Sequence, residues 1–219
     1  MVVVAIDGPG AVGKSTLARA LAQRLDLPHL DTGSYYRAAT LAVLRAGLDV
    51  DDHDGVVEAV RGARLDVRHG VMHLDDEPVA EEIRSDPVTE AVSAVSAIPE
   101  LRDVVVDQQR AWVERHGGSA VVEGRDIGTV VFPAADVKIF LTARPEVRAR
   151  RRMGDAEAAG KTFTELVADL RRRDRADSTR EVSPLRPADD ATVLDTSDLE
   201  LDEVVDEALR LVRRAINRR

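Results

Sequence analysis

A glycine-rich segment close to the start of the chain constrains the fold more than any other feature. It follows the apolar run Val2–Ile6 and leads directly into a helical pattern. Its residues are Gly8, Pro9, Gly10, Ala11, Val12, Gly13, Lys14, Ser15 and Thr16. A buried strand, a Gly-x-x-x-x-Gly-Lys-Ser loop and a helix start, in this order, are typical of a phosphate-binding loop. Because glycine has no Cβ, successive backbone N–H groups can approach phosphate oxygens closely. The segment therefore predicts binding of a nucleoside triphosphate.

The side chains at the end of this loop indicate how the triphosphate is held. Ser15 and Thr16 begin a helix whose positive dipole end faces the anion. We expect Lys14 to reach the β- and γ-phosphates and the Ser15 hydroxyl to hold Mg²⁺. The chain has 31 lysines and arginines, of which only Lys14, Lys138 and Lys161 are lysine, so a lysine at this position argues for a specific role. A turn that is glycine-rich for packing alone would explain the glycines but not the Lys-Ser-Thr sequence.

Length, charge and composition exclude several classes of protein. A chain of 219 residues buries a sizeable core and fits one α/β domain with inserted segments. The formal net charge of −9 argues against a nucleic-acid partner, and the absence of cysteine excludes disulfides and thiolate metal sites. No apolar run approaches a membrane span in length, and Met1–Ile6 lacks the basic leader of a signal peptide. We expect a cytoplasmic monomer without a membrane or nucleic-acid partner, since nothing in the sequence requires a larger assembly.

Short apolar segments alternate with helical patterns along most of the chain. The segments that predict strands are Val2–Ile6, Pro28–Leu30, Ala120–Val122, Val137–Leu141 and Thr192–Leu194. The expected helices are Lys14–Leu25, Ser34–Ala46, Pro99–Arg115, Glu146–Ala158, Phe163–Asp174 and Leu201–Arg218. Four of the strand segments are almost wholly apolar, as in strands covered on both faces. The alternation predicts an α/β fold with a parallel five-stranded sheet, helices on both faces, and ligands at the carboxyl ends of the strands.

Two segments interrupt this alternation. Leu65–Leu74 alternates apolar and polar residues around His69-Gly70, which predicts a small antiparallel hairpin. The segment 148–180 is rich in arginine on either side of Gly160. Its arginines are Arg148, Arg150, Arg151, Arg152, Arg171, Arg172, Arg173, Arg175 and Arg180. Positive runs on helices are usually solvated, but a kinase needs mobile cations that close over the transferring phosphates. We expect a helical, arginine-rich lid in which some of the arginines are functional.

Polar residues also follow the second strand segment. Asp31-Thr32-Gly33 is similar to half of an aspartic protease site, but such an enzyme needs two carboxylates that share a proton on a β-rich frame. The comparable triplet Asp195-Thr196-Ser197 lies in an α/β pattern, so we dismiss this interpretation. Arg37 follows Tyr35-Tyr36 at the start of a helix, where it can hold a second phosphate. A solvated helix arginine is the structural alternative.

A second polar group follows the strand segment Ala120–Val122. Glu123 is well placed to order water around Mg²⁺, and Gly124 allows the chain to leave the strand tightly beside the phosphates. Arg125 can clamp phosphate oxygens, and Asp126 can accept a hydrogen bond from an amino group. A capping turn is the structural alternative, and Asp126 fits it. The position at a strand end favours function over structure.

These segments together resemble bacterial cytidylate kinases, which are P-loop nucleoside monophosphate kinases. The resemblance runs the whole length of the chain. Beside the phosphate loop, it rests on Asp31–Arg37 (DTGSYYR), Glu123–Pro133 (EGRDIGTVVFP), Arg173–Arg180 (RDRADSTR) and Val193–Ser197 (VLDTS). The GRDIGTVVFP string is the most specific part. The family's motif usually begins with aspartate where this chain has Glu123, and Thr32 stands where some members have serine.

The resemblance implies a single P-loop kinase domain over residues 1–219, with Mg²⁺ as cofactor and with ATP and CMP or dCMP as substrates. The core would comprise 1–60, 99–147 and 181–219, a monophosphate-binding insert 61–98, and a lid 148–180. ATP would bind to residues 8–16, with Mg²⁺ on Ser15 and with Glu123 acting through water. The catalytic residues implied are Lys14, Arg125, Arg173 and Arg180. The CMP-binding residues implied are Thr32, Tyr36, Arg37, Ser93, Arg102, Gly124, Arg125, Asp126, Asp177 and Arg180. Of these, Ser93, Arg102 and Asp126 would contact the cytosine edge, and Arg37 and Arg125 the monophosphate.

Rival functions are other nucleotide-dependent classes. Another small-molecule P-loop kinase would act on thymidylate, adenylate or shikimate, and the Glu123–Pro133 segment argues against it. A GTPase switch or a nucleotide-dependent binding module would carry the guanine-reading Asn-Lys-x-Asp motif, but the only asparagine is Asn217. An ATPase motor would carry a second nucleotide signature, and the sequence has none. We therefore expect a kinase that acts on a nucleoside monophosphate.

Overall fold

The computed structural model describes residues 1–154, 158 and 160–217, which form two compact units. The first unit comprises Met1–His29 and Ala120–Arg219, and the second comprises Leu30–Ser119. The phosphate loop and the segment after Ala120 thus belong to the first unit, while the predicted hairpin belongs to the second.

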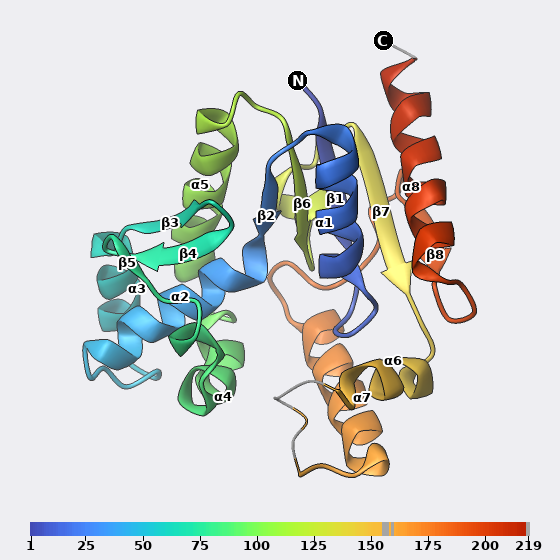
Figure 1. The fold of residues 1–219 in the computed structure, drawn as a ribbon. Coiled ribbons are helices and arrows are strands. Elements are labelled where there is room, and N and C mark those ends of the chain that lie inside the picture. The colour runs from blue at the N-terminus through green and yellow to red at the C-terminus, as the bar shows by residue number, and fades with distance from the viewer. Residues whose placement is uncertain (155–157, 159, 218–219) are drawn as a thin grey trace. The chain divides into compact units, whose positions relative to one another are not determined.

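A parallel five-stranded sheet with the order β2-β6-β1-β7-β8 forms the centre of the first unit, although only the first residue of β2 belongs to it (Figure 1). The strands are β1 (Val3–Asp7), β2 (His29–Asp31), β6 (Ala120–Gly124), β7 (Val137–Thr142) and β8 (Thr192–Asp195). The central strand β1 pairs with β6 and β7 in a register that places Asp7 beside Gly124 and Phe140. The carboxyl ends of these strands therefore meet where the phosphate loop begins.

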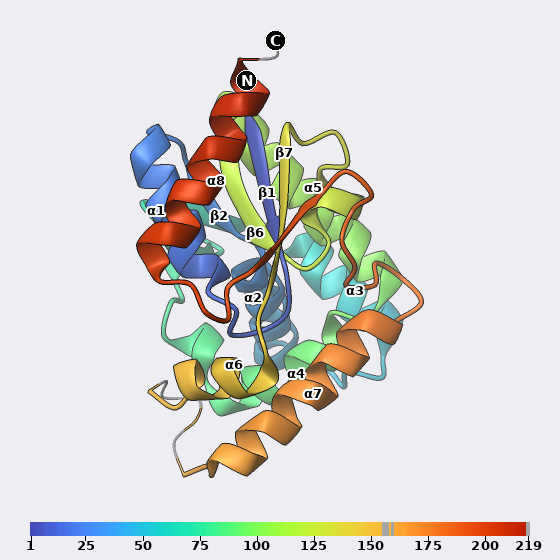
Figure 2. The ribbon, with the colours of Figure 1, turned by 90° about the vertical axis from the view of Figure 1, so that its right-hand side faces the viewer.

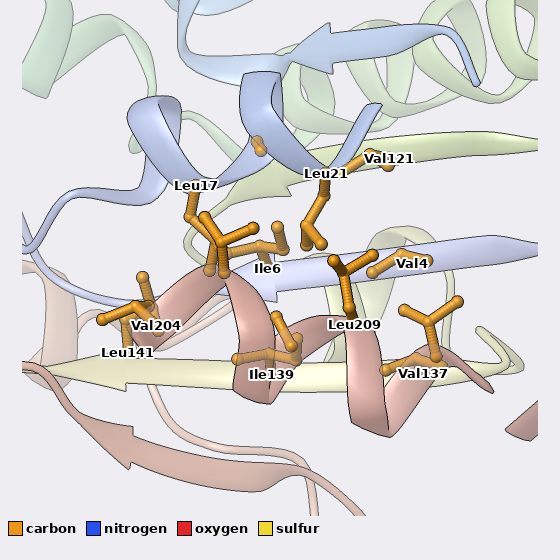
Figure 3. Packing of buried hydrophobic residues seen from close by; sticks show 14 of the residues in the cluster. Val4, Ile6, Leu17, Leu21, Val121, Val137, Ile139, Leu141, Val204 and Leu209 are labelled. Atoms are coloured by element: carbon orange, nitrogen blue, oxygen red, sulfur yellow. The ribbon is translucent and has the colours of Figure 1, made fainter. Parts of the chain in front are cut away.

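Two helices, α1 (Lys14–Leu25) and α8 (Leu201–Ile216), pack on one face of this sheet. They lie beside each other over the strands (Figure 2). Residues three or four positions apart share one helix face, so Leu17 and Leu21 of α1 point together with Leu209 of α8 toward Val4 and Ile6 of β1 (Figure 3). This packing fixes the start of α1, and with it the end of the phosphate loop.

The chain leaves β7 and enters α6 (Pro145–Arg152), which packs against α7 (Phe163–Thr179). Their contact is apolar at Ala149, Leu166 and Leu170. It also includes an ion pair, in which the buried Arg148 guanidinium donates to the partly exposed Asp174 at 2.7 Å (Oδ2) and 3.1 Å (Oδ1). The predicted arginine-rich segment is therefore helical, with the two helices held together by their inner faces.

The second unit combines helices with a small antiparallel sheet of order β3-β4-β5. Its elements are α2 (Thr32–Arg45), α3 (His53–Gly62), β3 (Leu65–Arg68), β4 (Val71–Leu74), β5 (Glu77–Pro78), the short 3₁₀ helix η1 (Glu82–Arg84), α4 (Asp86–Val95) and α5 (Pro99–Arg115). The turn between β3 and β4 consists of His69 and Gly70, with φ of +50° and +77°. Two consecutive residues of positive φ form the tight turn that matches the twist of a hairpin.

The structure confirms the predicted fold class, with the parallel sheet and the antiparallel hairpin in their predicted places. Strand ends differ from the predicted ones by one or two residues. The helix expected over Glu146–Ala158 is wrong in its length, because α6 ends at Arg152 and residues 155–157 lie outside the described part of the chain. The helix expected at Phe163–Asp174 continues to Thr179, and the last helix ends at Ile216, with Arg218 outside the described residues.

The elements α3, α4, β5, η1 and the π-helical turn η2 (Ile127–Val131) were not predicted. The division into core, insert and lid stays a prediction. Over the residues that the structure describes, no helix is both long and apolar enough to cross a membrane.

Candidate active site

The phosphate loop adopts a backbone that its glycines make possible. Gly8 has φ of +148°, and a Cβ at this position would lie 2.4 Å from the Leu141 carbonyl oxygen of β7. Gly13 has φ of +97° and is the N-cap residue of α1, where it has no side chain to cap the first turn. The N–H groups of that turn are the donors that an anion binds at a helix start. The loop is therefore shaped for phosphate, as the sequence predicts.

Lys14 and Arg125 bring positive charge to this loop. Lys14 is 8 % exposed, and its Nζ donates to the Pro9 carbonyl oxygen at 2.8 Å. A Cβ at Gly10 would lie 3.7 Å from the Arg125 guanidinium, which places Arg125 against the loop.

Glu123 connects the end of β6 to the start of α1. The Ser15 hydroxyl donates to its Oε2 at 2.7 Å, and its Oε1 lies 2.9 Å from His29 Nε2. The carboxylate is buried, with 2 % of Glu123 exposed, so hydrogen bonds to both oxygens offset the loss of water. The sequence analysis expects Ser15 to hold Mg²⁺ and Glu123 to act on it through water, and the structure shows a direct hydrogen bond between these two side chains.

A hydroxyl and a carboxylate are hard oxygen donors of the kind that Mg²⁺ prefers, usually with phosphate oxygens completing its coordination. Ser15 and Glu123 at the mouth of the loop therefore fit the cation that the sequence predicts. His29 was not singled out from the sequence. It is the first residue of β2, and its contact with Glu123 follows from the strand order, which places β2 beside β6 and which the sequence does not reveal.

Asp7, the last residue of β1, is a second buried carboxylate that the sequence analysis missed. It is 5 % exposed and accepts hydrogen bonds from the N–H groups of Ile127 and Gly128, both at 2.8 Å. Burial raises the pKa of its carboxyl from 3.8 to about 6, more than these two bonds lower it. The nearby charge of Asp126 also raises this pKa, and that of Lys14 lowers it.

One residue of the predicted lid, Asp177, contacts Arg125, which directly follows the end of β6. Arg125 Nε donates to Asp177 Oδ2 of α7 at 2.9 Å, which joins two of the predicted CMP-binding residues. Arg180 Nε donates to the Ser183 carbonyl oxygen at 2.7 Å. Arg173 lies in the wall of a small hollow. The other residues of this wall are Arg152, Lys161, Asp169 and Leu170.

Arg151 of α6 links the arginine-rich segment to the phosphate loop. Its guanidinium donates to the Val12 carbonyl oxygen at 3.3 Å, and to the hydroxyl and carbonyl oxygens of Thr196 at 3.0 and 2.6 Å. The Thr196 hydroxyl in turn donates to the carbonyl oxygens of Val12 and Thr142 at 3.3 and 3.2 Å. Nothing in the sequence separates Arg151 from its arginine neighbours, because these contacts join residues far apart in the chain.

In the second unit, the structure brings together Tyr36 and Arg102. The Arg102 guanidinium carbon lies 4.9 Å from the centre of the Tyr36 ring, in a cation–π contact. Arg102 is 3 % exposed, and its Nη1 donates to the Ser96 carbonyl oxygen at 3.0 Å. Burial, stacking and hydrogen bonding hold this arginine in one orientation, which suits a residue that recognises a base.

The other predicted acceptor residues of the second unit lie on α2 and α4. Arg37 donates to the Thr89 hydroxyl at 2.9 Å and to the Ile83 carbonyl oxygen at 3.1 Å. Ser93 is exposed and lies one turn beyond Thr89 on α4. Thr32 is buried in the first turn of α2, which Asp31 caps by accepting from the Gly33 N–H at 2.9 Å. Asp31 is thus a helix cap, in agreement with our dismissal of a protease site.

The chain matches known proteins over nearly its whole length. The family model described as cytidylate kinase matches residues 4–214. A cytidylate kinase of Nocardia farcinica is 52 % identical over 221 residues, covering 98 % of this chain and 95 % of the relative. One from Mycobacterium leprae is 51 % identical over 214 residues, covering 97 % and 96 %.

Solved structures agree at the level of the fold. A shikimate kinase from Bacteroides thetaiotaomicron has a TM-score of 0.50 at 14 % identity and covers 99 % of this chain and 98 % of that chain. An uncharacterized protein from Eubacterium ventriosum has a TM-score of 0.53 at 11 % identity and covers 97 % and 98 %. At such low identity these neighbours show that the fold is shared and nothing about substrates.

The raised pKa of Asp7 makes its contribution to stability dependent on pH. The folded protein binds this proton more tightly than the unfolded chain, so the contribution is full below the ordinary pKa of 3.8 and is lost as pH rises through about 6. Relative to Asp7→Asn, the free energy of unfolding should fall by about 3 kcal/mol across this range. Urea unfolding of the parent protein and of Asp7→Asn at a series of pH values measures this difference in the free energy of unfolding. A difference that stays constant with pH would contradict the prediction.

Proposed function

The chain belongs to the cytidylate kinase family, and we propose that the strand-end residues described above carry out its reaction. The protein is an ATP-dependent phosphotransferase that converts CMP to CDP and leaves ADP. We propose dCMP as a second acceptor. The observation that carries the assignment of residues is the phosphate loop with Lys14, Arg125 and the Ser15–Glu123 pair around it.

The donor nucleotide binds along residues 8–16 in this proposal. The backbone N–H groups of the loop and the first turn of α1 hold the phosphates, and Lys14 contacts the β- and γ-phosphates. Ser15, with its hydroxyl oriented by Glu123, holds Mg²⁺. When bound, this cation neutralises charge on the phosphate oxygens.

The acceptor needs little chemical help from the protein. The attacking atom is an anionic phosphate oxygen of CMP, so no general base is required. Catalysis then depends on alignment and on neutralising the charge that spreads over the equatorial oxygens of the moving group. We assign that role to Lys14, Arg125, Arg173 and Arg180. Arg125 lies against the phosphate loop and donates a hydrogen bond to Asp177 of α7. Both contacts support a position of its guanidinium between the two nucleotides.

The remaining assignments concern how CMP is recognised. Arg37 and Arg125 hold its phosphate, and Asp177 and Arg180 lie near its sugar and phosphate. Thr32, Tyr36 and Gly124 complete the acceptor site. Ser93, Arg102 and Asp126 contact the cytosine edge. The fixed orientation of Arg102 and the burial of Asp126, which is 3 % exposed, support this assignment.

We propose that residues 1–219 act as one kinase domain, a cytoplasmic monomer in which 61–98 bind the monophosphate. Residues 148–180 would close over the nucleotides, and positions 155–157 and 159 of this segment lie outside the described residues. The bond between Arg151 and the Val12 carbonyl oxygen supports a coupling of this segment to the loop.

The choice of acceptor base tests the proposed function. Cytosine offers an amino donor beside an unprotonated ring nitrogen, whereas uracil offers a carbonyl beside an N–H. With UMP, the Asp126 carboxylate would face a carbonyl, and each buried polar group left unpaired costs about 1–3 kcal/mol. We expect CMP and dCMP to be preferred over UMP by about 10²-fold or more in kcat/KM. Assays of ATP consumption with CMP, dCMP, UMP, AMP and dTMP measure this preference. Equal kcat/KM for CMP and UMP would contradict the assignment of Asp126 to the cytosine edge.

Arg37 and Arg125 test the position of the acceptor phosphate. Replacing either with methionine keeps most of the side-chain volume but removes a charged hydrogen bond, worth about 1.5–3 kcal/mol. We expect KM for CMP to rise by about tenfold or more and KM for ATP to change far less. Exposed Arg110 of α5 provides a matched control, since Arg110→Met should leave both constants unchanged. Steady-state kinetics with both substrates varied would contradict the assignment if both KM values rose equally.

A further inference from the structure

The peptide group between Val12 and Gly13 lies where the phosphate loop becomes the helix α1. The next peptide group is already helical, because the Gly13 carbonyl oxygen accepts from the Leu17 N–H at 3.0 Å. The Val12 side chain is buried in the apolar cluster that α1 and α8 form on the sheet. The orientation of the peptide between these two fixed points then depends on two angles, the ψ of Val12 and the φ of Gly13.

The backbone on both sides of Val12 has an unusual conformation. Ala11 has φ of +61° although it is not glycine, and Gly13 has φ of +97°. A residue other than glycine keeps a positive φ only where surrounding contacts hold it. Glycine allows either sign of φ, so the peptide before Gly13 rotates at little cost unless its carbonyl oxygen is held. A fixed loop therefore requires an anchor on the Val12 carbonyl group.

Two side chains from distant segments provide this anchor. The Arg151 guanidinium and the Thr196 hydroxyl each donate to the Val12 carbonyl oxygen at 3.3 Å. Arg151 also donates to the hydroxyl and carbonyl oxygens of Thr196 at 3.0 and 2.6 Å, so the two donors hold each other. Thr196 is 2 % exposed, and its N–H donates to the Thr142 carbonyl oxygen at the end of β7 at 2.9 Å. Arg151 and Thr196 thus form a clamp, the Val12 clamp, that is itself attached to the sheet.

The segment that contains Thr196 also holds the other end of α6. The Ser197 hydroxyl oxygen accepts from the N–H group of Arg144, the N-cap residue of α6, at 2.8 Å. The Arg144 guanidinium donates to the two carboxylate oxygens of Asp198 at 2.7 and 2.5 Å. Residues 196–198 therefore bind α6 at its start through Arg144 and in its last turn through Arg151. Of these two arginines, Arg151 is the one whose printed bonds extend to the phosphate loop.

A trans peptide group is planar, and its C=O and N–H bonds point in opposite directions. The clamp holds the Val12 carbonyl group toward α6 and Thr196, so the Gly13 N–H points away from both. We propose that Arg151 and Thr196 are positioning residues for ATP: they hold the Val12 carbonyl group and thereby direct the Gly13 N–H at a phosphate of the donor. This inference rests on the proposed binding of the triphosphate along residues 8–16. Neither clamp residue contacts a nucleotide in this proposal.

Variants of Thr196 and Arg151 test the clamp. Thr196→Val removes the hydroxyl and keeps the shape, Thr196→Ser keeps the hydroxyl, and Arg151→Met removes the guanidinium. If the Gly13 N–H keeps its direction in only about one tenth of the molecules, the apparent Kd for ATP rises about tenfold. We expect this rise for Thr196→Val and Arg151→Met, and a Kd near that of the parent for Thr196→Ser. The Kd for CMP should not change in any of them. Isothermal titration calorimetry measures both constants.

Tripolyphosphate separates the clamp from a direct contact with the nucleoside part of ATP. It carries three linked phosphates without a base or a sugar, so it needs the phosphate loop alone. We expect Arg151→Met and Thr196→Val to weaken its binding, with Mg²⁺ present, by the same factor as that of ATP. If these variants weaken ATP and leave tripolyphosphate unchanged, the two residues act on the base or the sugar, and the proposal is overturned.

Arg144→Met is the matched control, because Arg144 anchors the same segment to the same helix. It should leave the Kd for ATP unchanged. If it raises this Kd as much as Arg151→Met does, the effect is a general loosening of residues 196–198, and the proposal is overturned. The double variant of Arg151→Met and Thr196→Val should bind ATP about as tightly as the weaker single variant, because both changes act on one carbonyl group.

Lys14→Ala separates this proposal from the proposed function. If Lys14→Ala weakens tripolyphosphate binding and the clamp variants do not, the role of Arg151 and Thr196 is wrong and that of the phosphate loop stands. If the parent protein and Lys14→Ala bind tripolyphosphate equally weakly, residues 8–16 are not the triphosphate site, and the role of the clamp fails with that assignment.

Discussion

The close approach of the phosphate loop to β7 is the constraint on which the site depends. Gly8 passes the Leu141 carbonyl oxygen so closely that any Cβ would collide with the backbone. This contact is possible because β1 lies between β6 and β7 and all three end at one edge of the sheet. The apolar packing of α1 and α8 on the same strands then fixes where the loop ends and the helix begins.

Two buried carboxylates organise the polar groups at this edge. Glu123 joins Ser15 and His29, and Asp7 holds the turn after Asp126. Each would be costly to bury alone, but hydrogen bonds to both of its oxygens offset the loss of water. Their partners come from different elements, so the loop, the strand ends and the turn are held in one arrangement before any nucleotide binds. Such preorganisation is what phosphoryl transfer requires of a protein.

The sequence predicted the sheet, the hairpin and the loop because each has a local signal: apolar runs, alternation around His69-Gly70, and glycines before Lys14. It missed α3 and α4, which have ten residues each, with two glycines inside α3. The roles of Asp7, His29 and Arg151 could not be predicted, because their contacts with Ile127, Glu123 and Val12 span 120, 94 and 139 positions of the chain. The assignments to CMP and Mg²⁺ stay predictions, since they depend on ligands rather than on the fold.

The transfer of labelled γ-phosphate from ATP to CMP tests the central claim most directly. The claim is that the phosphate loop, through Lys14, neutralises charge on the moving phosphoryl group. Lys14→Ala should keep the fold, as measured by circular dichroism and thermal unfolding, and should form labelled CDP at least about 10²-fold more slowly, a loss of about 2.7 kcal/mol of transition-state stabilisation. If Lys14→Ala forms labelled CDP at a rate near that of the parent protein, the claim that Lys14 stabilises the moving phosphoryl group is contradicted.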